Sequence, residues 1–88
     1  MLTQNQEFDY ETLAPRVRAA LRRTFPDNST IVASPGYRGR VHAKVVSEQF
    51  NGISEREKQA IIWDALREEL NEEAKAVSLA LAYGTDEL

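Results

Sequence analysis

The sequence predicts a small α+β domain in which a helix, a β-hairpin and a second helix follow one another. Three observations carry the prediction: apolar residues at helical spacing over residues 13–25, two β-branched runs on either side of a Pro-Gly turn, and a helix-capping box at residues 54–57. Eighty-eight residues suffice for one hydrophobic core and not for two. We therefore expect a single domain over residues 1–88, with a flexible segment at 1–11 and a short tail at 84–88.

The first helix is predicted from about Leu13 to Phe25. Leu13, Val17 and Leu21 recur at intervals of four residues and so share one face of the helix, while arginines occupy the other side. Pro26 follows and ends the helix, because proline cannot continue the backbone hydrogen-bond ladder. This segment is therefore predicted to be amphipathic, with its apolar face toward the core.

The next two segments, STIVAS and VHAKVVS, are rich in β-branched residues and are separated by PGYRGR. The glycines and the proline supply the backbone conformations of a tight turn, so the pattern predicts a hairpin with a basic tip. In its second strand Val41, Ala43 and Val45 face one way, while His42 and Lys44 face the other. We expect a sheet covered on one face, with His42 on the less buried face.

A second helix, predicted to be the longest element, begins at SERE. The Ser54 hydroxyl can accept from the Glu57 N–H while the Glu57 carboxylate reaches back, and Ile62, Ala65 and Leu66 form the apolar stripe. The last segment, EEAKAVSLALAYG, is ambiguous on periodicity alone. Its composition favours helix, whereas its alternation of large and small residues favours a strand packed on one face.

The charge is divided along the chain. Residues 12–47 carry seven basic side chains and one acid, a net of +6, whereas residues 48–88 carry four basic and ten acidic side chains, a net of −6. One interpretation is a basic patch that attracts an anionic partner, and the other is that the two halves neutralise each other across the fold. The run Glu68, Glu69, Glu72 and Glu73 is interpreted as a solvated helix face.

Composition excludes several classes of protein. The chain has no cysteine, which rules out disulfides, thiolate metal sites and thiol catalysis. No apolar run approaches the roughly 20 residues that cross a bilayer, and the acidic, polar start of the chain is unlike a secretory signal. We therefore expect a cytoplasmic protein with no membrane partner.

HAKVVSEQFNGIS, followed by IIWDALREEL and AVSLAL, resembles the BolA family, over roughly residues 16–83. The most specific part is VSEQFNG, residues 46–52. The resemblance implies an α-β-β-α-β core like the class II KH fold, with the last segment as a third strand and the family's final helix truncated. It also implies a partnership with monothiol glutaredoxins in iron–sulfur metabolism, stress response and redox regulation. Some members of the family resemble transcriptional regulators that bind DNA.

The sequence departs from the family at the positions that matter for iron. Lys58, Gln59 and Ala60 stand where the family carries Arg-His-Arg, and Lys75 stands where it carries the histidine that ligates a [2Fe-2S] cluster shared with glutaredoxin. The loop PGYRGR lacks the cysteine or histidine that supplies a second ligand. A protonated lysine cannot replace imidazole. We therefore expect no cofactor of its own in this chain.

The candidate chemical groups are few. His42 is the only histidine, so it is the one candidate for weak metal ligation or a pH-sensitive contact, and by itself it makes no specific metal site. Ser47 and Ser54 are interpreted as turn and cap residues, because no Ser-His-Asp set can be assembled around them. The protein is therefore predicted to be non-enzymatic, with no catalytic residues.

Two functional hypotheses remain. The first is an adaptor that contacts a protein partner through the hairpin tip, the exposed side of the second strand and two lysines. The second is a KH-like nucleic-acid-binding regulator that uses a basic ridge along the hairpin, although the Gly-x-x-Gly clamp of such sites is present only as GYRG within the hairpin turn and as GISE elsewhere. The predicted contact residues are Tyr37, Arg38, Arg40, His42, Lys44, Lys58 and Lys75. We expect a monomer or a weak homodimer.

Overall fold

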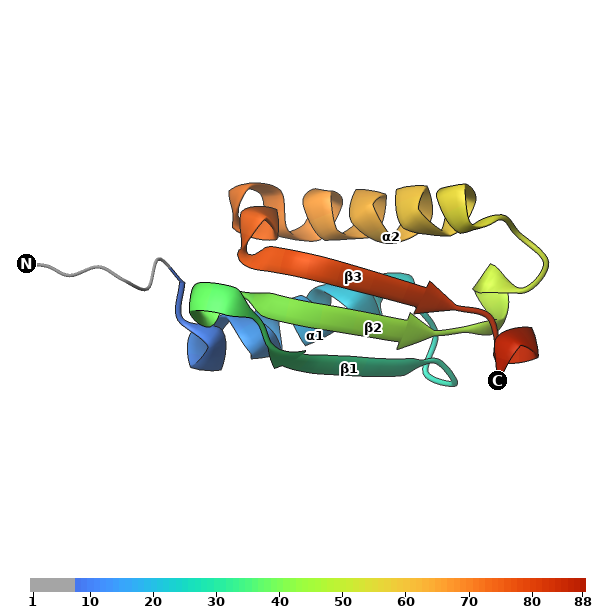
Figure 1. Ribbon diagram of the computed structural model, residues 1–88, viewed down its shortest axis with the longest axis horizontal. Coiled ribbons are helices and arrows are strands. Elements are labelled where there is room, and N and C mark those ends of the chain that lie inside the picture. The colour runs from blue at the N-terminus through green and yellow to red at the C-terminus, as the bar shows by residue number, and fades with distance from the viewer. Residues whose placement is uncertain (1–7) are drawn as a thin grey trace, which may run out of the picture.

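A computed structural model describes residues 8–88, and these form an α-β-β-α-β domain (Figure 1). The main elements are α1 (Tyr10–Thr24), β1 (Thr30–Pro35), β2 (Val41–Val46), α2 (Glu55–Leu70) and β3 (Val77–Tyr83). Short 3-10 turns lie between and after them: η1 (Tyr37–Gly39), η2 (Glu48–Phe50), η3 (Asn71–Ala76) and η4 (Thr85–Glu87). None of the helices in the described part of the chain is long and apolar enough to cross a bilayer. The predicted element order is confirmed, including the strand at the ambiguous last segment.

The sheet is mixed and has β2 at its centre. β1 pairs antiparallel with β2, as the hairpin predicts, and Ala33 lies opposite Ala43. β3 pairs parallel with β2, because α2 carries the chain back to the starting edge before β3 begins. Both helices cover the same face of the sheet, α1 behind β1 and β2 and α2 along β3, so no helix of residues 8–88 covers the other face (Figure 1).

α1 begins earlier than the apolar pattern predicts. The Asp9 carboxylate accepts from the Glu11 N–H and from the Thr12 hydroxyl, so it caps the helix, and Tyr10 is already helical. Tyr10 and Glu11, which the sequence analysis assigns to a flexible segment, thus belong to α1, and residues 1–7 lie outside the described residues. The helix ends at Thr24, where Phe25 turns into an extended conformation before Pro26.

The core lies between the helices and the covered face of the sheet. Its largest fully buried side chains include Phe25 from the end of α1, Phe50 from η2 and Leu66 from α2. The Phe25 and Phe50 rings meet with centroids 5.2 Å apart at 48°. This tilted contact ties the loop after β2 to the loop after α1.

The loop after β2, where the family resemblance is most specific, is built by ordinary turn chemistry. The Ser47 hydroxyl accepts from the Gln49 N–H at 3.2 Å and from the buried Ser29 hydroxyl at 2.9 Å. Gly52 has φ of 75°, a left-handed conformation that favours glycine. The predicted turn role of Ser47 is confirmed.

α2 begins with the predicted capping box. The Ser54 hydroxyl accepts from the Glu57 N–H at 3.2 Å, and the Glu57 carboxylate accepts from the Ser54 N–H at 3.4 Å. The helix ends at Leu70, and Asn71 follows with φ of 54°. The predicted cap role of Ser54 is confirmed.

The predicted tail is a structured segment that folds back onto the domain. We call residues 84–88 the C-terminal strap, because η4 lies within it and its side chains bind the loop before α2 and the first turn of α2. Asn51 holds it by donating to the Thr85 hydroxyl at 2.9 Å and accepting from the Asp86 N–H at 3.1 Å.

Acidic and basic segments meet across the helices. Arg16 forms an ion pair with Glu73, and Arg23 Nη1 lies 2.9 Å from Glu69 Oε1. The hypothesis that the basic and acidic halves neutralise each other is therefore confirmed for these two pairs. Both are exposed, so they contribute little to stability.

Candidate functional site

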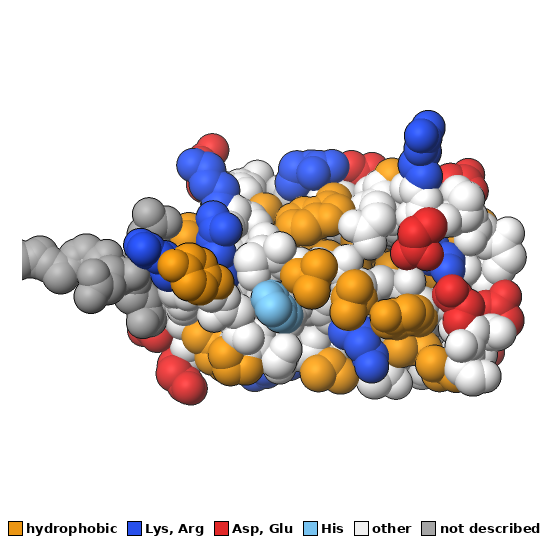
Figure 2. Space-filling model, viewed as in Figure 1, with side chains coloured by type: hydrophobic (Ala, Val, Ile, Leu, Met, Phe, Trp, Pro, Cys, Tyr) orange, Lys and Arg blue, Asp and Glu red, His pale blue; other side chains and the backbone are white. Residues whose placement is uncertain are grey.

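The open face of the sheet carries a row of side chains that the helices do not cover. Alternation along β2 points His42 and Lys44 outward, whereas Val41, Ala43 and Val45 are buried against the helices. The outward side chains of β1 and β3 flank them, and together they surround a shallow depression of about 260 Å³. We call this the open-face patch and define it by Val32, Ser34, His42, Lys44, Leu79 and Leu81. Figure 2 shows this face, with apolar side chains around the single histidine.

Three of the six side chains that define the patch are apolar. Val32 is 44% exposed and Leu79 is 42% exposed, and Leu81 and Tyr83 are half-buried beside them. The cause lies in β3, where the small Ala80 and Ala82 face the helices and the larger side chains face outward. The alternation of large and small residues thus corresponds to the two faces of β3. The large residues, however, lie on the uncovered side, and they were missing from the predicted contact residues.

His42 lies at the hairpin end of the patch, directly over Gly36. A Cβ atom at Gly36 would lie 2.7 Å from both His42 Cδ2 and Ser78 Oγ, so only glycine lets the imidazole pack against the turn. The ring is half-buried, as predicted for the less buried face. Its place beside the Gly36 backbone is that of a surface side chain.

The hairpin tip presents Tyr37 and Arg38. Arg38 and Gly39 both have positive φ, 56° and 82°, and the Arg40 N–H donates to the Tyr37 carbonyl at 3.1 Å. Two central residues with positive φ make the kind of turn whose twist matches a hairpin. Tyr37 is 72% exposed, and the Arg38 guanidinium lies 5.3 Å from its ring centroid. The expected exposure of Tyr37 is confirmed.

The predicted basic ridge is not continuous. The Arg40 guanidinium lies 5.2 Å from the centroid of the Phe8 ring, which precedes α1, and Arg40 does not line the depression. Lys44 lies 5.9 Å from the ring centroid of Tyr83 and is surrounded by apolar residues of the patch. Cations at the tip are therefore separated from Lys44, and only His42 and Lys44 of the predicted ridge line the depression.

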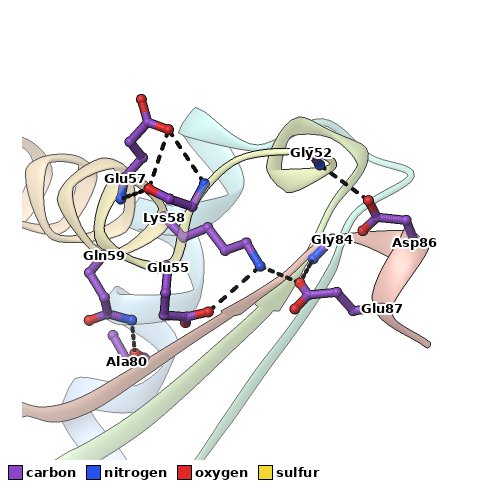
Figure 3. A network of polar contacts seen from close by, with 10 residues as sticks. Gly52, Glu55, Glu57, Lys58, Gln59, Ala80, Gly84, Asp86 and Glu87 are labelled. Carbon is purple, nitrogen blue, oxygen red and sulfur yellow. Dashed lines mark hydrogen bonds and ion pairs between the residues drawn. The ribbon is translucent and has the colours of Figure 1, made fainter.

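Lys58 is not at the predicted contact surface, and the prediction is corrected. It is 4% exposed, because its side chain runs beneath the strap to bind the Glu87 carboxylate at 2.5 Å (Figure 3). The hydrogen bond that Lys58 donates to the Glu87 carboxylate raises the pKa of Lys58 above its ordinary value, against the opposing effect of burial, so the ammonium is charged at neutral pH. Lys75 is exposed as predicted and pairs with Glu72 at 3.1 Å.

The side chains of residues 8–88 do not fit the iron–sulfur cluster that the family resemblance implies. Among residues 8–88, no three His, Asp or Glu side chains gather where they could hold a metal ion. Lys75, which the resemblance aligns with the family's ligand, is a cation paired with a carboxylate, and His42 is packed on Gly36. Imidazole or thiolate ligands are what such a cluster requires.

No family model, curated protein or solved structure matches this chain.

Proposed function

We propose that this protein is a non-catalytic adaptor that binds a protein partner through the open-face patch and the hairpin tip. The observation that carries the proposal is the set of apolar side chains, Val32, Leu79 and Leu81, that flank His42 and Lys44 on the sheet face away from the helices. Apolar patches of this kind mark interaction sites, because burying them against another protein removes them from water. Tyr37, at the tip, adds one of the residue types that are enriched at protein interfaces.

The partner we propose is a monothiol glutaredoxin, which the resemblance to BolA proteins suggests. In this proposal the present chain contributes contact surface and no cluster ligand, since neither Lys75 nor the hairpin tip offers one. The adaptor would thus alter access to a cluster that the glutaredoxin holds by its own means. Redox or iron-related regulation is the role that follows.

Nucleic-acid binding is the second candidate, and the arrangement of cations disfavours it. A phosphate backbone is bound by rows of exposed basic side chains, and such binding weakens steeply as salt rises. Here Arg40 covers Phe8, and Lys44 stands among apolar side chains. An apolar protein interface, by contrast, loses little affinity with salt.

The test is a titration of the protein into a monothiol glutaredoxin, with and without its cluster, followed by size-exclusion chromatography and visible circular dichroism. We expect a heterodimer whose cluster spectrum is the same with wild-type protein and with His42→Ala. Leu79→Glu should weaken binding by about tenfold or more, because it buries a charge in the interface.

Ile61→Glu is the matched control. Ile61 is 37% exposed on α2, away from the patch, so the same change in charge there should leave the affinity intact. Absence of a complex with a folded protein would overturn the glutaredoxin proposal. Equal losses of affinity from Leu79→Glu and Ile61→Glu would overturn the assignment of the open-face patch as the binding surface. Binding to a single-stranded oligonucleotide that disappears at high salt would favour the second candidate.

A further inference from the structure

A buried lysine ammonium lies at the start of α2, outside the open-face patch. Among residues 8–88, Lys58 is the one charged residue that is buried. A buried charge is costly unless it is paired, and its partners here are Glu87 of the strap at 2.5 Å and Glu55 at 3.7 Å. The long side chain points toward the N-terminus of its helix, which places the ammonium beside the loop that precedes α2.

The strap supplies two carboxylates to this end of the domain (Figure 3). Glu87 accepts from Lys58 Nζ and, at 2.7 Å, from the Gly84 N–H within the strap. Asp86 accepts from the Gly52 N–H at 3.2 Å. The Lys58 ammonium and the Gly52 amide are thus both satisfied by carboxylates of the strap.

Both donors lie where an anion is favoured. They stand at the N-terminal end of a 16-residue helix, where the helix dipole is positive. The Gly52 N–H donates to the strap carboxylate of Asp86 at 3.2 Å, so departure of the strap removes this acceptor from the amide. Glu55 and Glu57 oppose an anion, but the Glu57 carboxylate is engaged in the capping box.

We propose that the Lys58 ammonium and the Gly52 amide form a phosphate-binding site that the C-terminal strap occupies with its own carboxylates. The ligand is a phosphate dianion, as in a phosphate monoester, because its two negative charges replace those of Asp86 and Glu87. A phosphodiester has one charge and would replace only one carboxylate. The strap is a competitor tethered at an effective concentration of about millimolar or more, so the intact protein binds phosphate weakly.

Strap release also changes the surface of the domain. Lys58 then becomes a contact residue beside Gly52, instead of a buried one. This site is separate from the open-face patch, and it stands whether or not a glutaredoxin binds there.

The experiment follows the Gly52 and Lys58 backbone amides by NMR while inorganic phosphate is added at constant ionic strength. In Asp86→Ala with Glu87→Ala the amides should shift saturably, with an apparent affinity about tenfold or more above that of the wild type. Adding Lys58→Met should abolish the response. Phosphoserine should act like inorganic phosphate, whereas dimethyl phosphate should bind at least several-fold more weakly.

Glu72→Ala is the matched control, because it frees Lys75 on the surface without a neighbouring amide donor. Saturable shifts at Lys75 in that variant would show that any released lysine suffices, and would overturn the site. So would a folded double variant without a saturable shift. If the double variant does not fold, the wild type at high phosphate decides the matter. Joint shifts of Gly52 and Glu87 support displacement of the strap, and unmoved amides refute it.

Discussion

Replacing Phe50 by alanine should remove a large part of the stability of this domain. Phe50 is fully buried and lies 5.2 Å from Phe25, ring centre to ring centre. Truncation of a buried phenylalanine costs about 3–5 kcal/mol through lost burial and the cavity left behind. An 88-residue domain has a free energy of unfolding of about 4–13 kcal/mol. We therefore expect the melting temperature to fall by about 12–40 °C.

The assay is urea denaturation followed by the fluorescence of Trp63, the single tryptophan, which is half-buried on α2. Tyr37→Ala is the control, because it truncates an aromatic side chain that is 72% exposed and should change the free energy of unfolding by less than about 0.5 kcal/mol. A double-mutant cycle with Phe25→Leu and Phe50→Leu should give a coupling of about 0.5–1.5 kcal/mol. A cost below about 1 kcal/mol for Phe50→Ala would refute the assigned packing.

Two further predictions concern the strap and the loop before α2. Hydrogen bonds from Lys58 and the Gly84 N–H hold the pKa of Glu87 below its ordinary 4.5, so its contribution to stability is present above pH 4.5 and is lost as the pH falls through the folded-state pKa. Glu87→Gln should reduce the loss of unfolding free energy between about pH 7 and about pH 3, as measured by urea denaturation. An unchanged pH profile in the variant would contradict the pairing of Glu87 with Lys58. Gly52→Ala should lower the free energy of unfolding by about 1–2 kcal/mol. The cause is the positive φ alone, since no described atom outside the neighbouring residues lies within 4 Å of the new Cβ. Gly52→Asn should cost less, and equal costs would indicate a different cause.

The elements that local chemistry determines were predictable. The capping box at Ser54 sets the start of α2, and PGYRGR produces the hairpin turn because its glycines permit the required conformations. Ser47, Phe50 and Gly52 lie in the segment where the family resemblance is most specific. The structure accounts for them as a turn residue, a core side chain and a positive-φ position.

The candidate site was less predictable, because it depends on contacts between distant residues. Nothing near Lys58 in the sequence indicates that Glu87, 29 positions later, will cover it. Strand alternation places Arg40 in the basic ridge, yet its guanidinium lies over the Phe8 ring. The alternation along β3 does not say which face is covered, and only the position of α2 over the alanines places Leu79 on the outside. One local signal was overlooked: Asp9 precedes a helical pattern as a cap does.

The parallel pairing of β3 with β2 also constrains how the chain folds during synthesis. α1 and the β1–β2 hairpin emerge from the ribosome first, yet one edge of β2 has no hydrogen-bond partner until residue 83 has been made. Such a sheet forms through contacts that are distant in sequence, which slows folding and exposes the unpaired edge meanwhile. The nascent chain therefore passes through a stage in which the centre of the final sheet is an open edge, and this is the stage at which chaperone binding or aggregation should occur.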